Sequence, residues 1–268
     1  MQTNFEKLKP YRFLIFSLPA IGFPVLITNF FGKQIAATTT DILFVPLSGT
    51  LFVLSVIIAK RFNGKGNHGV GYLCFCGFAA TWFIAELVWA ISEISNHLSP
   101  FPQIDEYFYL AGYPLLLLFT YYYLKPVGIA ISKKMLGLAA LTSVAFLTPT
   151  FYTIYSYNPD ASISQILWAG IYPIADAILL FPTVIGMIMF FKGDVSMLWS
   201  LMFFAILLNV VADSGFLYLD VDKSYYSGNP INILYLWAYV LFSFGLYSHI
   251  KVFRKPKMKS YGNVDEFK

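Results

Sequence analysis

Carboxylates alternate with aromatic rings at helical spacing in two apolar stretches of this chain. The first stretch carries Trp82, Glu86, Trp89, Glu93 and His97. The second carries a set that matches the first four at a shift of 127 residues, namely Asn209, Asp213, Phe216 and Asp220. Residues three or four apart lie on one face of an α-helix, so each stretch would present its acids and rings to the same neighbours.

A carboxylate beside aromatic faces attracts cations. The acid supplies charge, and the cation–π attraction of a ring adds about 0.5–2 kcal/mol. We therefore predict an outward-opening, acidic and aromatic cavity for a proton, a metal ion or an organic cation. The predicted binding residues are Glu86, Trp89, Glu93, Asp176, Asp213, Phe216 and Asp220. The alternative interpretation is that these acids are protonated, or paired with Tyr, Ser and Trp donors, and only hold helices together.

The sequence offers little to support catalysis or metal binding. A metal site could form from His97, Glu93 and either Asp105 or Glu106. A single histidine in a loop is weak evidence for metal binding, so we expect no metal there. The motifs His-Glu-x-x-His and Gly-x-Ser-x-Gly are absent, and so is a phosphate-binding Gly-rich loop. We therefore expect neither an enzyme nor a bound cofactor.

The composition indicates that lipid surrounds the elements that carry these residues. The chain is 58% hydrophobic and 12% charged, whereas soluble domains are about 45–50% apolar and about 25% charged. Stretches long enough to cross a bilayer are 13–31, 41–59, 69–94, 107–124, 135–155, 165–191, 196–219 and 231–250. We predict an all-α polytopic membrane protein, a single membrane domain over 1–268 with about eight transmembrane helices. Its main partner is the lipid bilayer, and we expect no binding to nucleic acid.

The distribution of basic residues predicts the orientation. With eight spans, sixteen of the eighteen Lys and Arg residues fall on one side, and only Lys33 and Lys223 fall on the other. Basic residues collect on the cytoplasmic side of a membrane. Both termini are therefore expected in the cytoplasm of a cell-membrane protein, including a basic tail over 251–268. Asp41 lies near the opposite interface, where it could cap a helix.

The matching stretches extend to their neighbours and predict an internal duplication. The segment from Asp41 to Pro46 resembles the segment from Asp176 to Pro182. The Tyr109–Tyr113 and Tyr235–Tyr239 segments also match, with Glu106 corresponding to Asn232. We predict two parallel four-helix repeats, over about 13–125 and 135–250, related by an axis along the membrane normal.

One part of the sequence resembles a known family. The segments concerned are Trp82 to Glu86 and Phe101 to Pro114. They are similar to the multi-helix membrane input regions that precede GGDEF-type cyclase domains and histidine kinase domains. Similar regions also occur as free-standing archaeal membrane proteins. Gln103, Glu106 and Asn232 stand where that pattern has Ser, Asp and Asp. The resemblance implies a sensory, ligand-binding module. The chain ends about 18 residues after its last predicted span, so signalling would require a separate cytoplasmic partner.

Three functions are compatible with these patterns. The leading hypothesis is a free-standing, sensor-like membrane module that binds a small ligand or cation in the acidic cavity of its outer half. The second is a proton- or cation-coupled secondary transporter, favoured by parallel repeats, buried acids and the prolines Pro46 and Pro182 in matching spans. The third is a structural subunit of a larger membrane complex.

The eight-span orientation can be tested by labelling. We expect reporter fusions to place 60–68, 126–134 and 250–268 in the cytoplasm, and 32–40, 97–106, 157–164 and 220–230 outside. A cysteine introduced as Gly64→Cys should resist a membrane-impermeant thiol reagent in intact cells and react after lysis. Labelling in intact cells would overturn the orientation.

Overall fold

The chain folds almost entirely into helices. The computed structural model describes residues 4–95, 103–157, 170–193 and 195–252. Its α-helices are α1 (Asn4–Thr28), α2 (Lys33–Phe62), α3 (Gly66–Ile94), α4 (Ile104–Leu124), α5 (Lys133–Tyr157), α7 (Ile171–Phe190), α8 (Ser196–Val221) and α9 (Asn232–Val252). Short 3₁₀ turns cover Asn29–Phe31 and Lys125–Ala130. The prediction of an all-α protein is confirmed for these ranges.

Most of these helices are suited to a bilayer. Seven of them, all except α4, are long and apolar enough to cross a membrane. Helix α4 has 21 residues, which span about 30 Å at about 1.5 Å per residue, but its acids and tyrosines make it more polar. Large apolar side chains face outward, such as Phe13, Phe16 and Phe23 on α1. The chain is therefore a multi-pass membrane protein.

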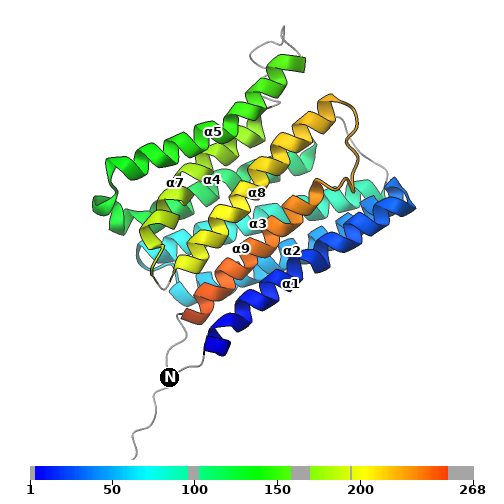
Figure 1. Ribbon diagram of the computed structural model, residues 1–268. Helices are drawn as coiled ribbons and strands as arrows, with labels where there is room; N and C mark the ends of the chain where they lie inside the picture. The colour runs from blue at the N-terminus through cyan, green and yellow to red at the C-terminus, as the bar shows by residue number, and fades with distance from the viewer. Residues whose placement is uncertain (1–3, 96–102, 158–169, 194, 253–268) are drawn as a thin grey trace, which may run out of the picture.

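Six helices form a closed ring of contacts. Helix α2 packs against α3, α3 against α4, α4 against α7, α7 against α8 and α8 against α9, which returns to α2. Helix α1 lies outside this ring against α2 and α9, and α5 lies outside it against α7 and α8 (Figure 1). Helices distant in sequence, such as α2 and α9, thereby share one interior.

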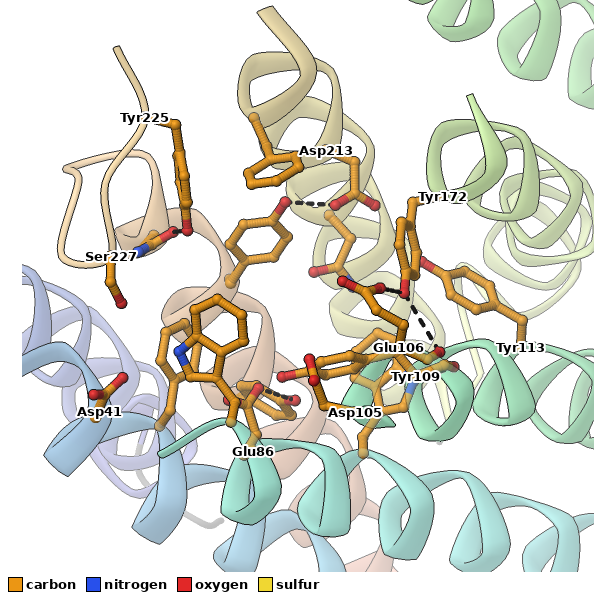
Figure 2. Close-up of a pocket in the computed structure, with 18 residues that line it drawn as sticks. Asp41, Glu86, Asp105, Glu106, Tyr109, Tyr113, Tyr172, Asp213, Tyr225 and Ser227 are labelled. Carbon is orange, nitrogen blue, oxygen red and sulfur yellow. Dashed lines mark hydrogen bonds between the residues drawn. The ribbon is translucent and has the colours of Figure 1, made fainter. Parts of the chain in front are cut away.

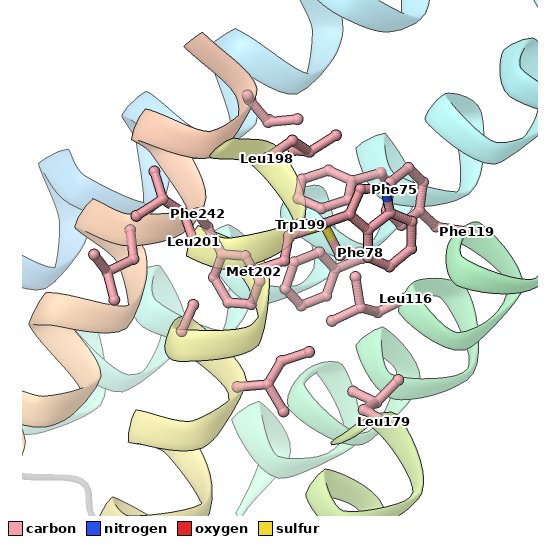
Figure 3. Packing of buried hydrophobic residues seen from close by; sticks show 14 of the residues in the cluster. Phe75, Phe78, Leu116, Phe119, Leu179, Leu198, Trp199, Leu201, Met202 and Phe242 are labelled. Atoms are coloured by element: carbon pink, nitrogen blue, oxygen red, sulfur yellow. The ribbon is translucent and has the colours of Figure 1, made fainter. Parts of the chain in front are cut away.

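Aromatic side chains fill one end of this interior. Phe75 and Phe78 of α3, Phe119 of α4, Trp199 of α8 and Phe242 of α9 are all fully buried (Figure 3). The ring centroids of Phe75 and Phe119 are 5.0 Å apart, and those of Phe78 and Phe242 are 5.6 Å apart. Such edge-to-face pairs contribute beyond simple area burial. This filled end leaves the opposite end, where α3 and α8 finish, as the place for a cavity.

The start of α2 differs from the prediction. A span was expected from residue 41, but the helix begins at Lys33, directly after Gly32. Asp41 therefore lies inside the helix and is 6% exposed, so its interpretation as a helix cap is wrong. Thr38 and Thr40 make these first turns resemble a polar loop in the sequence, but their hydroxyls donate to the helix carbonyls of Gln34 and Ala36.

Two further expectations concern the prolines and the ends of two predicted segments. Helices α2 and α7 continue unbroken through Pro46 and Pro182. The predicted span at 165–191 corresponds to α7, and its first residues, 165–169, lie outside the described residues, as does most of the 251–268 tail. Matching prolines therefore do not produce unwound breaks in the described helices.

Close packing of α7 against α8 depends on Gly186. A Cβ atom added to this residue would lie 2.0 Å from Cε3 of Trp199, whose side chain is 0% exposed. A buried indole ring cannot move aside without disturbing the aromatic end of the core. The absence of a side chain at Gly186 thus sets how closely these helices approach.

We expect Gly186→Ala to lower the stability of the detergent-solubilised protein by about 1–3 kcal/mol, the usual cost of overpacking. The matched control is Gly137→Ala, since Gly137 lies in the interior of α5 with no atom near its added Cβ. That control should be neutral or slightly stabilising because alanine favours helix. Thermal unfolding would measure both, and equal effects of the two variants would contradict the packing argument.

Candidate ligand-binding site

A polar cavity occupies the end of the ring where α3 and α8 finish and α4 and α9 begin. Its volume is about 170 Å³, room for on the order of ten water molecules. The described lining consists of five carboxylates, six tyrosines and seven other side chains: Asp41, Glu86, Asp105, Glu106, Asp213, Tyr109, Tyr113, Tyr172, Tyr225, Tyr235, Tyr239, Phe44, Phe216, Trp82, Trp89, Asn209, Asn232 and Ser227 (Figure 2). No Lys, Arg or His is among these residues.

Glu86 of α3 forms the acidic group on one wall. Its carboxylate is 5% exposed and accepts a 2.7 Å hydrogen bond from the hydroxyl of Tyr239 on α9. Tyr109 of α4 lies within hydrogen-bonding reach of the same carboxylate. Asp41 of α2 is close enough to add its charge. The Tyr239 hydroxyl therefore replaces part of the water that a buried carboxylate lacks.

Asp213 of α8 forms the acidic group on another wall. It accepts a 2.5 Å hydrogen bond from the hydroxyl of Tyr235 on α9, and Tyr113 of α4 lies within hydrogen-bonding reach. Asp176 of α7 is 1% exposed and lies beside Asp213, close enough for their carboxyl groups to hydrogen-bond. Asp176 is not part of the cavity lining. It extends the acidic group of Asp213 into the protein.

Asp105 is the acid with the least support from protein groups. It lies in the first turn of α4 and is 1% exposed, and neither of its carboxylate oxygens has a hydrogen-bond partner among the described residues. Its neighbour Glu106 accepts a hydrogen bond from Tyr172 of α7. Figure 2 places Asp105 between Glu86 and Glu106, and it interacts electrostatically with both. A buried carboxyl group without donors is costly, so Asp105 favours a partner that enters the cavity.

The connection between α8 and α9 closes one side of the cavity. The Ser227 hydroxyl donates a 2.6 Å hydrogen bond to Glu93 of α3, and the Asn29 amide donates a 3.0 Å bond to the Gly228 carbonyl. Gly228 has φ +77°, and an added Cβ would lie 2.4 Å from the backbone of Ala36. Only glycine permits this conformation and this close approach to α2.

Tyr225 in the same connection contributes a neutral hydroxyl to the cavity wall. Its ring packs edge-to-face on Phe216 at 4.5 Å, and its hydroxyl donates to Asn232 over 3.4 Å. Burial raises the pKa of the Tyr225 phenol above its ordinary value. The group therefore keeps its proton and remains a hydrogen-bond donor.

The predicted binding residues are distributed unevenly around this cavity. Glu86, Trp89, Asp213 and Phe216 line it. Glu93 is linked to it through Ser227, and Asp176 lies behind Asp213. Asp220 is exposed in the last turn of α8 and does not line the cavity, because the chain turns toward α2 and α3 beyond that point. His97 lies outside the described residues.

Sequence reasoning missed the tyrosines. Tyr235 and Tyr239 on α9 donate hydrogen bonds to the buried acids, and Tyr109 and Tyr113 on α4 lie within hydrogen-bonding reach of them. Each pair is spaced by four residues, the same helical spacing that identified the acids. The signal is therefore present in the sequence, but tyrosine is common in this chain, and the two pairs served only to indicate the repeat.

The arrangement of these side chains is acidic and aromatic, without grouped metal ligands among the described residues. Within the described ranges, no three His, Cys, Asp or Glu side chains are grouped to hold a metal ion. The acids are separated by tyrosines that occupy some of their oxygens. A nucleophile–base pair of the kind used in hydrolysis is not found among the lining residues.

No protein-family model, curated protein or solved structure matches the chain. The fold and the site therefore define its class on their own, as a multi-pass α-helical membrane protein with an acidic, tyrosine-lined cavity inside the bundle.

The support of Glu86 by Tyr239 can be measured. We expect Tyr239→Phe to lower the stability by about 1–3 kcal/mol, because it leaves a buried carboxylate with one donor fewer. Tyr247→Phe, also on α9, is the control, since Tyr247 is 41% exposed and the variant keeps the ring that Lys251 covers. Thermal unfolding in detergent would compare them. A Tyr239→Phe variant as stable as the control would show that the hydrogen bond adds nothing.

Proposed function

We propose that the protein is a sensor-like membrane module that binds a small organic cation in the acidic cavity. One observation carries this proposal: five carboxylates and no basic residue line the described cavity wall, and the buried Asp105 has no donor for either oxygen. An incoming cation would neutralise this charge and satisfy Asp105.

Aromatic rings favour an organic cation over an inorganic one. Trp82, Trp89, Phe44 and Phe216 line the cavity alongside the acids. A ring face attracts an ammonium group by about 0.5–2 kcal/mol and also accepts its alkyl carbons. A hard metal ion would instead require several oxygens around one point, whereas these acids come from α2, α3, α4 and α8.

The proposal includes an orientation in the cell membrane. We take α4 as the eighth span, because eight spans put sixteen basic residues on one side and two on the other. Both termini then lie in the cytoplasm, and the cavity lies in the outer half of the membrane, accessible to an external ligand. Any response would pass to a separate protein on the cytoplasmic side.

Two features support binding over the alternatives. The aromatic core fills the ring at the end opposite the cavity, and α2 and α7 are unbroken at Pro46 and Pro182. A transporter would be expected to have broken helices at its binding site. A purely structural subunit would be expected to pair its buried acids, which leaves the lack of donors at Asp105 unexplained.

Asp105→Asn tests the proposal directly. Isothermal titration of the purified protein with butylammonium chloride should show affinity reduced about tenfold or more, the effect of losing roughly 1.4 kcal/mol of ionic interaction. In the absence of ligand the variant should be as stable as the wild type or more stable, because an uncompensated buried charge is removed.

Asp222→Asn is the matched control, since Asp222 is exposed and lies outside the cavity. It should change neither affinity nor stability. If the wild type binds butylammonium and Asp105→Asn binds it equally well, Asp105 is not part of the site. If the wild type binds no ammonium compound at all, the proposed function is wrong.

A further inference from the structure

Two acids in the cavity have nearly equivalent surroundings. Glu86 is contacted by Tyr109 of α4 and Tyr239 of α9. Asp213 is contacted by the other two tyrosines of the same helices, Tyr113 of α4 and Tyr235 of α9. Helices α4 and α9 therefore each direct one tyrosine to each acid.

This exchange follows the predicted duplication. Glu86 corresponds to Asp213 at a shift of 127 residues, and Tyr109 and Tyr113 correspond to Tyr235 and Tyr239 at a shift of 126. Under these shifts the contact between Glu86 and Tyr239 becomes the contact between Asp213 and Tyr113.

The helices follow the same rule, and the neighbouring acids follow it only in part. Asp176 lies within hydrogen-bonding reach of Asp213, whereas its counterpart Asp41 lies within reach of Glu93 and adds only its charge at Glu86. At the level of helices, α2 packs on α9 while its counterpart α7 packs on α4. The cavity therefore contains two similar acid–tyrosine groups on different walls, which we call the Glu86 subsite and the Asp213 subsite.

Both subsites open into one cavity, since Glu86, Asp213 and all four tyrosines line it. The same cavity is also lined by four aromatic side chains other than tyrosine and by Asp105, whose oxygens have no donor among the described residues. A ligand with one positive charge, bound at Asp105, would leave both subsites as buried carboxylates held by tyrosines.

We propose that the natural ligand is a linear aliphatic polyamine, with one terminal ammonium group at the Glu86 subsite and the other at the Asp213 subsite. This inference rests on the proposed function and names its ligand class. Each ammonium has three N–H donors, which suit a carboxylate together with side-chain oxygens that line the same cavity, such as those of Asn209, Asn232 or Ser227. The methylene groups contact the aromatic residues of the lining, and an internal ammonium group of the polyamine meets Asp105.

The wild-type protein alone can test this inference. Isothermal titration should be carried out with a series of linear α,ω-diamines of increasing chain length, each compared with the n-alkylamine of equal carbon number. We expect the best diamine to bind at least about tenfold more tightly than its monoamine, since it adds a second charge-assisted contact. Affinity should peak at one chain length, because two fixed subsites set one spacing.

Two variants assign the ends of the ligand. Glu86→Gln and Asp213→Asn keep side-chain shape and remove one charge each. Each should reduce the affinity for the best diamine to about that of the monoamine, while Asp222→Asn leaves the advantage of the diamine intact. The wild-type series is a sufficient test by itself if either variant fails to fold.

The outcomes separate this inference from the proposed function. If monoamines bind and diamines gain nothing over them, or if affinity only rises steadily with chain length, the polyamine inference is overturned while the cation site stands. If neither diamines nor monoamines bind, both are overturned.

Discussion

Burying a carboxylate inside a membrane bundle requires donors that do not come from water. An ionised acid at the centre of a span costs about 2.5–3.5 kcal/mol on insertion scales. Here tyrosine hydroxyls meet that requirement, from Tyr239 to Glu86, from Tyr235 to Asp213 and from Tyr172 to Glu106. Every one of these bonds joins two helices. The acids therefore hold together the same walls that they would use to bind a ligand.

The distribution of aromatic residues follows from this constraint. At one end of the six-helix ring, the fully buried side chains of Phe75, Phe119 and Trp199 pack ring against ring. At the other end the aromatic residues are mainly tyrosines and tryptophans, which offer a polar atom to the acids and a ring face to the cavity. The aromatic end holds the helices against one another. At the polar end, hydrogen bonds fix the acids and tyrosines on opposing helices, around the cavity.

Closure of the cavity depends on a short connection and not on the helices alone. Gly228 brings the α8–α9 connection against the backbone of α2, where Asn29 donates to its carbonyl. Ser227 thereby reaches Glu93, so one acid of the α3 stripe serves closure while Glu86 faces the interior.

The all-α architecture and the membrane environment could be predicted from the chain, as could the places of Glu86 and Asp213 in the cavity lining, because hydropathy, length and helical spacing are local properties. The same spacing also selected Asp220, which is exposed and lies outside the cavity lining. It also failed to identify Asp41 as a helix-interior residue, or Asp105 and the four tyrosines as part of one cavity. Those assignments depend on which helices meet: α4 and α9 lie more than a hundred residues apart in sequence and converge only when the ring closes through α2 and α7. The local sequence pattern thus determines which face of a helix is polar. Packing across the ring decides which polar faces share a cavity, because it depends on contacts such as that of Glu86 with Tyr239, which no spacing along the chain encodes.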